Sequence, residues 1–260
     1  MAPRRAVDVL RGNSAAYRAF SSSLRKEAPD MPDEYESRKL VDEFHDFIRD
    51  SGFVCVGAKS ALARDNIRTY VARDINSAWD DVAIYRQLIE FAHNYSAERE
   101  LFQSFVVLFE NSRDLSEQEF EKALWSRVQS LSDKDALHGQ DYDSRVSSDP
   151  EDPHFSLSFG GEGFFVVGLH PRASRAARRF SCAALVFNLH DQFELLRDAG
   201  KYEKMRDAIL SRDEKVNGSI NPMLSRHGES SEAKQYSGRR VGQEWRCPFD
   251  PEQRKSYDAF

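Results

Sequence analysis

The stretch FSLSFGGEGFFVVGL, residues 155–169, decides the fold class of this 260-residue chain. An apolar run at residues 155–159 is followed by Gly160 and Gly161, and a second apolar run covers residues 163–169. Two short apolar runs joined by glycines predict two antiparallel strands with a tight turn between them. We therefore expect a β-hairpin here, so the sheet cannot consist of parallel βαβ units alone.

Helical and strand-like segments alternate along the rest of the chain. The segments with helical spacing of apolar residues are 33–50, 77–95, 116–131, 188–197 and 201–215. The apolar runs that predict further strands are 53–56, 67–75, 105–109 and 184–187. Ser77 and Asn188 are the expected N-caps of their helices, and Ser116 and Glu119 have the spacing of a capping box. Together with the hairpin, this order predicts an α+β (mixed α/β) fold with one central mixed sheet flanked by helices.

The chain divides into a short extension and one large domain. Residues 1–30 mix Arg, Ser and Pro and predict an N-terminal extension that is partly helical. Residues 31–260 predict a single α+β domain. Within it, residues 132–153 are rich in Asp, Ser and Gly, which predicts a long surface loop or a small insertion.

Composition excludes several classes of protein. The chain has 37 Lys and Arg against 43 Asp and Glu, a net charge of −6, which disfavours a nucleic-acid-binding protein. Its longest apolar run, residues 164–169, is far shorter than the roughly 18–20 residues of a membrane span. With no signal-peptide pattern at the N-terminus, we expect a cytoplasmic protein. Cys55, Cys182 and Cys247 lack the spacing of a zinc or redox motif and are too few for a disulfide scaffold.

His170 and the arginines that follow it are the first candidates for chemistry. His170 ends the second apolar run, so it is either a core histidine or a ligand of a metal or haem iron, or a general base. If the next segment is helical, Arg172, Arg175 and Arg179 share one face. Such a face suits carboxylates or phosphates, and haem would need both a nitrogen for its iron and anchors for two propionates. The alternative is a solvated basic face.

Two further residues stand in unusual surroundings. Glu162 lies between the two apolar runs of the hairpin, where it is either an exposed turn carboxylate or a group that holds a cationic substrate in a cavity. Cys247 precedes a proline in the segment 245–249, WRCPF. A cysteine in this position is either a small buried apolar residue or a thiolate ligand of haem iron.

Seven segments of the chain resemble the YqcI/YcgG family. They are FVCVGAKSAL (53–62), FSLSFGGEGFFVVGLHP (155–171), SRAARRF (174–180), LVFNLHDQFELLR (185–197), GSINPML (218–224), SEAKQYSGR (231–239) and WRCPF (245–249). The resemblance therefore extends over nearly the whole expected domain. One departure is Asn188-Leu189-His190, where the family often has Asn-Pro-His.

The resemblance implies an activity and its cofactor. Characterised members are haem-dependent N-oxygenases that oxidise a nitrogen of amino-acid-like substrates, such as the guanidino group of arginine or the side-chain amine of lysine, in natural-product biosynthesis. This implies haem b, O2 as co-substrate, a small cationic amino acid as substrate and a redox partner that supplies electrons. We expect neither nucleic acid nor membrane as a partner, and a homodimer is compatible with these features. A haem sensor or carrier without turnover, and a haem-free protein that binds a small anion, stay open as alternatives.

Within that activity, each candidate residue takes a role. His170 is the expected iron ligand, with His190 and Cys247 as rivals, and His190 could instead donate to bound oxygen as a distal residue. The expected propionate contacts are Arg172, Arg175 and Arg179. The expected substrate contacts are Glu162, Asn221 and Glu232, with Glu162 also suited to act as a base.

Overall fold

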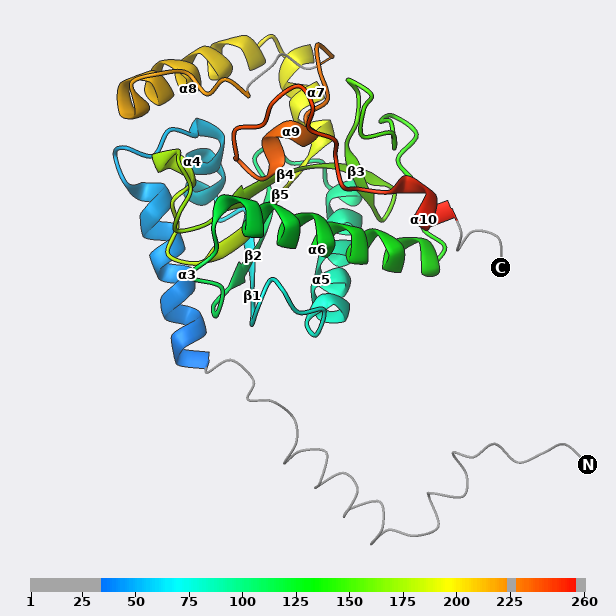
Figure 1. Cartoon of the computed structure of the whole chain (residues 1–260). Coiled ribbons are helices and arrows are strands. Elements are labelled where there is room, and N and C mark those ends of the chain that lie inside the picture. Colours follow the sequence, from blue (N-terminus) through cyan, green and yellow to red (C-terminus); the bar gives the residue numbers. More distant parts are fainter. Residues whose placement is uncertain (1–33, 224–227, 256–260) are drawn as a thin grey trace, which may run out of the picture.

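In the computed structural model, the described residues 34–223 and 228–255 form a mixed five-stranded sheet with helices on both faces (Figure 1). The strands are β1 (Ile67–Ala72), β2 (Ser104–Phe109), β3 (Leu157–Phe159), β4 (Glu162–Leu169) and β5 (Ala183–Leu189). Their order is β1-β2-β5-β4-β3, in which β1 and β2 are parallel and the other neighbours are antiparallel. The predicted fold class, with one mixed sheet flanked by helices, is confirmed.

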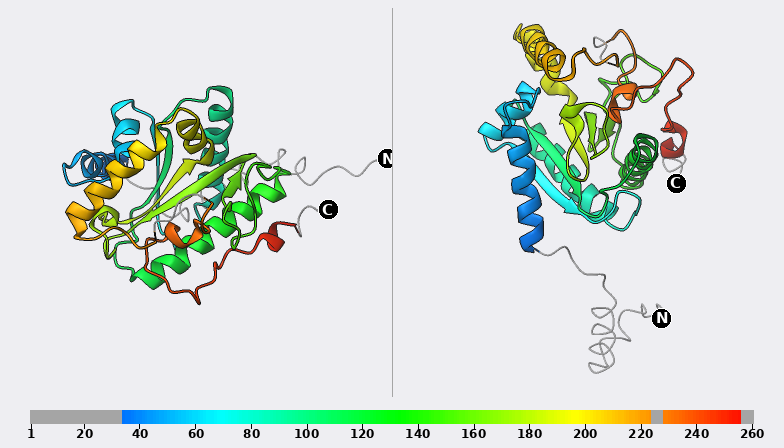
Figure 2. Two further views of the ribbon diagram at one scale, coloured as in Figure 1. Left: turned by 90° about the horizontal axis from the view of Figure 1, so that it is seen from above. Right: turned by 60° about the vertical axis from the view of Figure 1, so that its left-hand side comes forward.

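The helices lie in two groups on opposite faces of the sheet. They are α3 (Glu34–Arg49), α4 (Val56–Ala63), α5 (Asp81–Ala97), α6 (Glu117–Leu137), α7 (His190–Asp198), α8 (Tyr202–Asn217), α9 (Ala233–Tyr236) and α10 (Pro251–Lys255). The right-hand view of Figure 2 shows α3 along one face and α6 along the other. None of the helices in the described part of the chain is long and apolar enough to cross a bilayer.

The hairpin forms as predicted and fixes the register of the C-terminal strands. Phe159 of β3 pairs with Glu162 of β4, so Gly160 and Gly161 are the two turn residues. Both glycines have positive φ, +61° and +77°, which is the backbone that a tight two-residue hairpin turn requires.

Successive side chains of each strand point to opposite faces of the sheet, so the buried apolar residues form two clusters, one on each face. On β2, Phe105 and Val107 point to the α5 and α6 face, whereas Val106 and Leu108 pack on the α3 and α4 face. Every residue of β2 is buried and the strand lies between β1 and β5, as its unbroken apolar run predicted.

Three local predictions are wrong. Residues 53–56 are not a strand: the chain is irregular up to Cys55, which caps α4, because the helix formers Ala61 to Ala63 extend a helix from Val56. Ser77 does not cap α5; its hydroxyl accepts the Trp79 N–H in the preceding turn. Asn188 lies within β5 and bonds Ser104 across the sheet instead of capping α7.

The predicted loop at residues 132–153 begins too early, because α6 continues to Leu137. In its last turns the carboxylate of Asp135 is buried and paired rather than solvated. Asp135 is fully buried, and it accepts hydrogen bonds from Arg254 Nη1 and from the Gly160 N–H, both at 2.9 Å. The predicted N-terminal extension, residues 1–30, lies outside the described residues.

Candidate functional site

A cavity of about 330 Å³ lies on the sheet face that carries α3 and α4. Its floor is apolar because the alternation of β4 and β5 presents Phe165, Val167 and Val186 to this side. Helices α7 and α8 cover it with Phe193, Leu196 and other apolar side chains. Its volume and its mainly apolar surface, with polar and charged groups on the walls, are typical of small-molecule and cofactor sites, which span about 300–1,000 Å³.

Arg178 is one of the cationic groups on the cavity wall. Its guanidinium donates to the carbonyl oxygens of Gly168, Tyr236 and Gln235 at 3.1, 3.0 and 2.9 Å. Within the described residues its hydrogen bonds therefore go to neutral backbone groups. Burial lowers the pKa of Arg178 to about 10, and the negative charge of Asp213 opposes that effect. A guanidinium in this state favours an anion in the cavity.

Arg175 and Asp213 form a second charged group on the same wall. Arg175 Nη1 lies 3.4 Å from Asp213 Oδ2 and donates to the Ser219 carbonyl at 2.6 Å. Asp213 is buried and also accepts the backbone N–H of Asn221 at 2.9 Å. Two predicted residues, Arg175 and Asn221, thus meet at the cavity, and Glu232 lines it from the N-terminal end of α9. Asp213 was not predicted, since nothing in its local sequence distinguishes it from other helical acids.

His190 also lines the cavity, and both of its ring nitrogens have partners. Nδ1 lies 3.3 Å from the Ser156 hydroxyl, and Nε2 lies 3.2 Å from Glu194 Oε1. The ring is buried at the first residue of α7. These contacts orient the imidazole. Either nitrogen would have to give up its partner before it could bind a ligand in the cavity.

Cys55 is the cysteine that lines the cavity. Its Sγ accepts the Ala58 N–H at 3.4 Å, in the first turn of α4. Burial raises the pKa of the Cys55 thiol, while backbone N–H groups and Arg178 oppose this rise. The sequence prediction missed Cys55 because residues 53–56 resembled a buried strand, although the residue lies within a segment typical of the family.

His170 lies on the opposite face of the sheet. Its ring stacks on Phe120 of α6, with 4.5 Å between ring centroids, and is 1% exposed. Burial lowers the pKa of His170, and its Nδ1 has no hydrogen-bond partner among the described residues. The packing beside it is tight, since a Cβ at Gly168 would stand 2.6 Å from the Phe120 ring. The predicted iron ligand therefore does not line the cavity and is packed tightly against α6.

The arginine segment does not form the predicted helical face. Only Ala176–Arg178 is helical, as a short 3-10 turn, and the side chains of Arg178 and Arg179 donate to the preceding carbonyls of Gly168 and Ala173. Arg172 is exposed and pairs with Asp114, and Arg179 is exposed and donates to the Ala173 carbonyl. Of the three predicted arginines only Arg175 lines the cavity, and Arg178 joins it there.

Glu162 belongs to an ion-pair cluster outside the cavity. Its carboxylate accepts from Arg145 Nη2 at 2.6 Å and from the Ser96 hydroxyl at 2.5 Å. Arg145 also binds Asp143 and Asp191, so three buried carboxylates share one guanidinium. Although burial opposes it, hydrogen bonding to Arg145 lowers the pKa of Asp143. The arrangement is that of a structural cluster, and the structure does not bring Glu162 to the other predicted substrate contacts.

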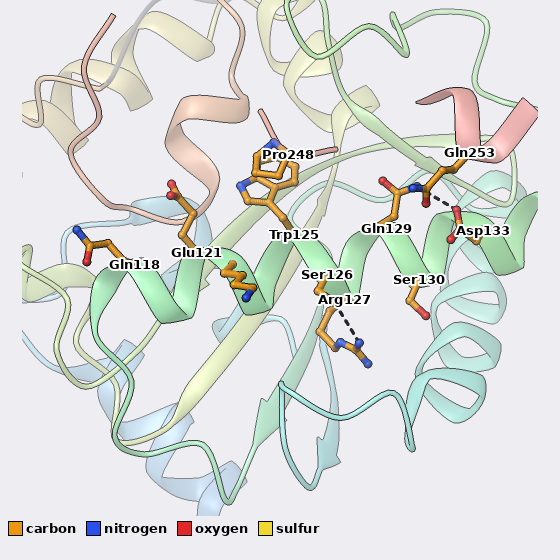
Figure 3. Close-up of a pocket in the computed structure, with 11 residues that line it drawn as sticks. Gln118, Glu121, Trp125, Ser126, Arg127, Gln129, Ser130, Asp133, Pro248 and Gln253 are labelled. Carbon is orange, nitrogen blue, oxygen red and sulfur yellow. Dashed lines mark hydrogen bonds between the residues drawn. The ribbon is translucent and has the colours of Figure 1, made fainter. Parts of the chain in front are cut away.

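Cys247 and the C-terminal segment pack on the α6 side. Cys247 contacts the core cluster formed by α5, α6 and the sheet, and burial raises its pKa to about 12. Next to it, Trp125 and Pro248 meet over a groove along α6 (Figure 3). This groove is lined mainly by polar side chains and contains none of the predicted site residues. The cavity on the other face is therefore the candidate functional site.

Comparison with known proteins places the chain in a family. No curated protein and no solved structure matches it. The YqcI/YcgG family model matches residues 44–250, a span that contains every residue lining the cavity. Because the match covers most of the chain, the protein belongs to the YqcI/YcgG family.

Proposed function

We propose that this protein is a haem-dependent N-oxygenase that oxidises a side-chain nitrogen of a cationic amino acid, such as arginine or lysine, in natural-product biosynthesis. The observation that carries the proposal is the cavity, which combines an apolar floor, arginines on one wall and a side chain able to bind iron, Cys55. These are the three kinds of group that haem requires: an apolar slot, anchors for propionates and an axial donor. Bound haem supplies the iron that activates O2.

The residues present fit the anionic edge of haem. Arg175 and Arg178 lie on one wall, and Arg178 gives its hydrogen bonds only to backbone carbonyls among the described residues. Carboxylates bound by guanidinium groups form strong charge-assisted hydrogen bonds. We therefore assign the propionate contacts to Arg175 and Arg178, in place of the set expected from the sequence.

Asp213 and Glu232 are the carboxylates that line the described part of the cavity. A cationic side chain is stabilised by such groups, and Asn221, on the same wall, adds an amide. Oxidation of nitrogen requires its lone pair, so an ammonium or guanidinium group must first lose a proton. A carboxylate within hydrogen-bond reach, such as Glu232, can accept it.

In the proposed function, helices α7 and α8 shield the cavity from water. Met205, Ile209 and Leu196 cover the floor with apolar surface and so restrict water around the reacting nitrogen. The sequence contains no flavin or nicotinamide motif, so electrons come from a redox partner. The three cysteines are free thiols, which suits the reducing cytoplasm where we place the protein.

The test is an optical titration of the purified full chain with haemin, followed by turnover with a panel of cationic amino acids, O2 and a reductant. A Soret band and a product heavier by one oxygen atom are expected. A Soret band with no product from any substrate would favour a haem carrier or sensor. A protein that gains no Soret band would refute the proposal and favour a haem-free protein that binds a small anion.

A further inference from the structure

We propose that Cys55 supplies the thiolate that binds the haem iron. This inference rests on the proposed function, since it requires haem in the cavity. It assigns the axial ligand to a residue that the sequence did not indicate and excludes the three that it did.

The backbone around Cys55 is suited to holding a thiolate. Cys55 immediately precedes α4, and its Sγ accepts the Ala58 N–H at 3.4 Å. Backbone N–H groups at a helix N-terminus stabilise negative charge on sulfur. The sulfur accepts this bond and keeps further lone pairs for a metal, which an imidazole with both nitrogens engaged does not.

The space beside the sulfur is apolar, and at Gly57 it could hold a methyl group without a clash. A Cβ at Gly57 would stand 3.8 Å from Cys55 Sγ and 3.9 Å from both Met205 Sδ and Phe102 Cδ1. Gly57 therefore leaves a gap bounded by Cys55, Met205 and Phe102, and all four residues line the cavity. Because Gly57 has no Cβ, a flat ring can approach the sulfur more closely at this position than it could beside any other residue.

The positive charges near Cys55 also favour its thiolate form. Arg178 and Arg212 oppose the effect of burial on its thiol, and Arg178 lines the same cavity. A guanidinium near the sulfur compensates part of the cost of a buried negative charge. A metal ion that takes the thiolate compensates the rest.

The rival ligands are poorly placed. His190 lines the cavity, but its nitrogens face the Ser156 hydroxyl and the Glu194 carboxylate. His170 is stacked on Phe120 on the other face of the sheet, and Cys247 packs against the core on that same side. Among the three, only His190 could reach the iron, and it would have to give up a partner to do so.

Binding of the Cys55 sulfur to ferric iron needs no added oxidant or reductant. The S–H bond of Cys55 breaks, its proton leaves to solvent, and the sulfur lone pair forms the bond to ferric iron. No electron is transferred. The step therefore releases one proton when haem binds through a protonated thiol.

The experiment is the ferrous–carbonyl spectrum of the haemin-loaded full chain. Wild type is expected to show the strongly red-shifted Soret band of a thiolate-ligated haem. Cys55→Ala is expected to lose that band, while the matched variants Cys247→Ala and His190→Gln keep it. A histidine-type band in wild type, or a thiolate band that survives Cys55→Ala, would overturn the assignment while leaving haem binding intact. A wild-type protein that gains no Soret band would refute both this assignment and the proposed function.

A second measurement on the wild-type protein guards against a variant that fails to fold. Cys55 and Cys247 are both partly exposed but have raised thiol pKa values, so the haem-free protein is treated with iodoacetamide at alkaline pH until both are measurably alkylated. Prior loading with haemin is expected to suppress alkylation of Cys55, quantified by peptide mass spectrometry, and to leave Cys247 unchanged. Equal alkylation of Cys55 with and without bound haem would contradict the proposal.

Discussion

The imidazole of His170 lies parallel to the ring of Phe120, with 4.5 Å between centroids and 21° between planes. This stack holds the end of β4 against α6, on the face of the sheet opposite the cavity. His170 is thus a packing residue, and its removal should affect the free energy of unfolding and leave ligand binding unchanged.

The first prediction concerns pH. Burial lowers the pKa of His170 in the folded protein relative to 6.5, so protonation favours the unfolded chain. The stability that neutral His170 contributes is fully present above pH 6.5 and is lost as the pH falls through the folded pKa. His170→Phe keeps an aromatic ring and removes the titration. Urea unfolding between pH 7.5 and 5 should therefore show a smaller decline for His170→Phe than for wild type. Identical declines would disprove this role, and haemin uptake at pH 7.5 should be the same in both.

The second prediction concerns the cluster around Arg145. Removing Arg145 leaves Asp143, Glu162 and Asp191 buried without their shared cation. Breaking a buried ion pair from one side costs about 3–5 kcal/mol, and because Arg145 is 40% exposed we expect Arg145→Ala to cost about 3 kcal/mol. Urea unfolding of the haem-free protein measures this.

Arg99→Ala is the matched control for that prediction. Arg99 lies 3.9 Å from Asp191 and is 55% exposed, so its loss should cost less than about 1 kcal/mol. If the two variants lose equal stability, the cluster does not have the structural role assigned to it. The folded fraction of each variant should bind haemin like wild type.

The third prediction separates the arginines at the cavity from those outside it. Arg178→Gln removes a charged donor from the cavity wall, so the dissociation constant for haemin should rise about 10- to 100-fold, as for the loss of one charge-assisted hydrogen bond. Arg172→Gln changes an exposed side chain paired with Asp114 and should have no effect. Fluorescence quenching by haemin gives both constants, with circular dichroism to verify the fold. An effect of Arg172→Gln equal to that of Arg178→Gln would place the propionates elsewhere.

The fourth prediction concerns the substrate. Glu232→Gln keeps the shape of a cavity residue but removes its charge, so kcat/KM for a cationic amino acid should fall about tenfold or more. Haemin binding should not change. Glu203→Gln, an exposed acid of α8 outside the cavity lining, serves as the control and should keep wild-type turnover. Steady-state rates by mass spectrometry distinguish the two, and an unchanged kcat/KM in Glu232→Gln would remove Glu232 from the substrate site.

The sequence supports the fold further than it supports the site. Gly160-Gly161 and the Ser116–Glu119 capping box are local signals, and both form as predicted. Cys55 was assigned to a strand because four apolar residues do not distinguish a buried strand from the start of a helix. Only the helix places its sulfur beside a cavity.

The separation of His170 from the cavity has a different origin. Side chains alternate along β4, so the sequence separates Val167 and Leu169 from Val166 and His170 but does not say which set faces a cavity. That depends on how α7 and α8 return over the sheet, which is set by long-range packing. Arg175 and Arg178 reach the cavity for the same reason, through contacts with α8 and α9 that are distant in sequence.

Titration of the purified full chain with haemin tests the central claim most directly. We expect a Soret band that saturates at one haem per chain, because the proposed site is a single cavity on the α3 and α4 face of the sheet. We also expect that Val167→Arg, which places a charge on the cavity floor, abolishes saturable binding in a protein that stays folded. A chain that gains no Soret band, or that binds haem equally well with arginine at position 167, would contradict this claim.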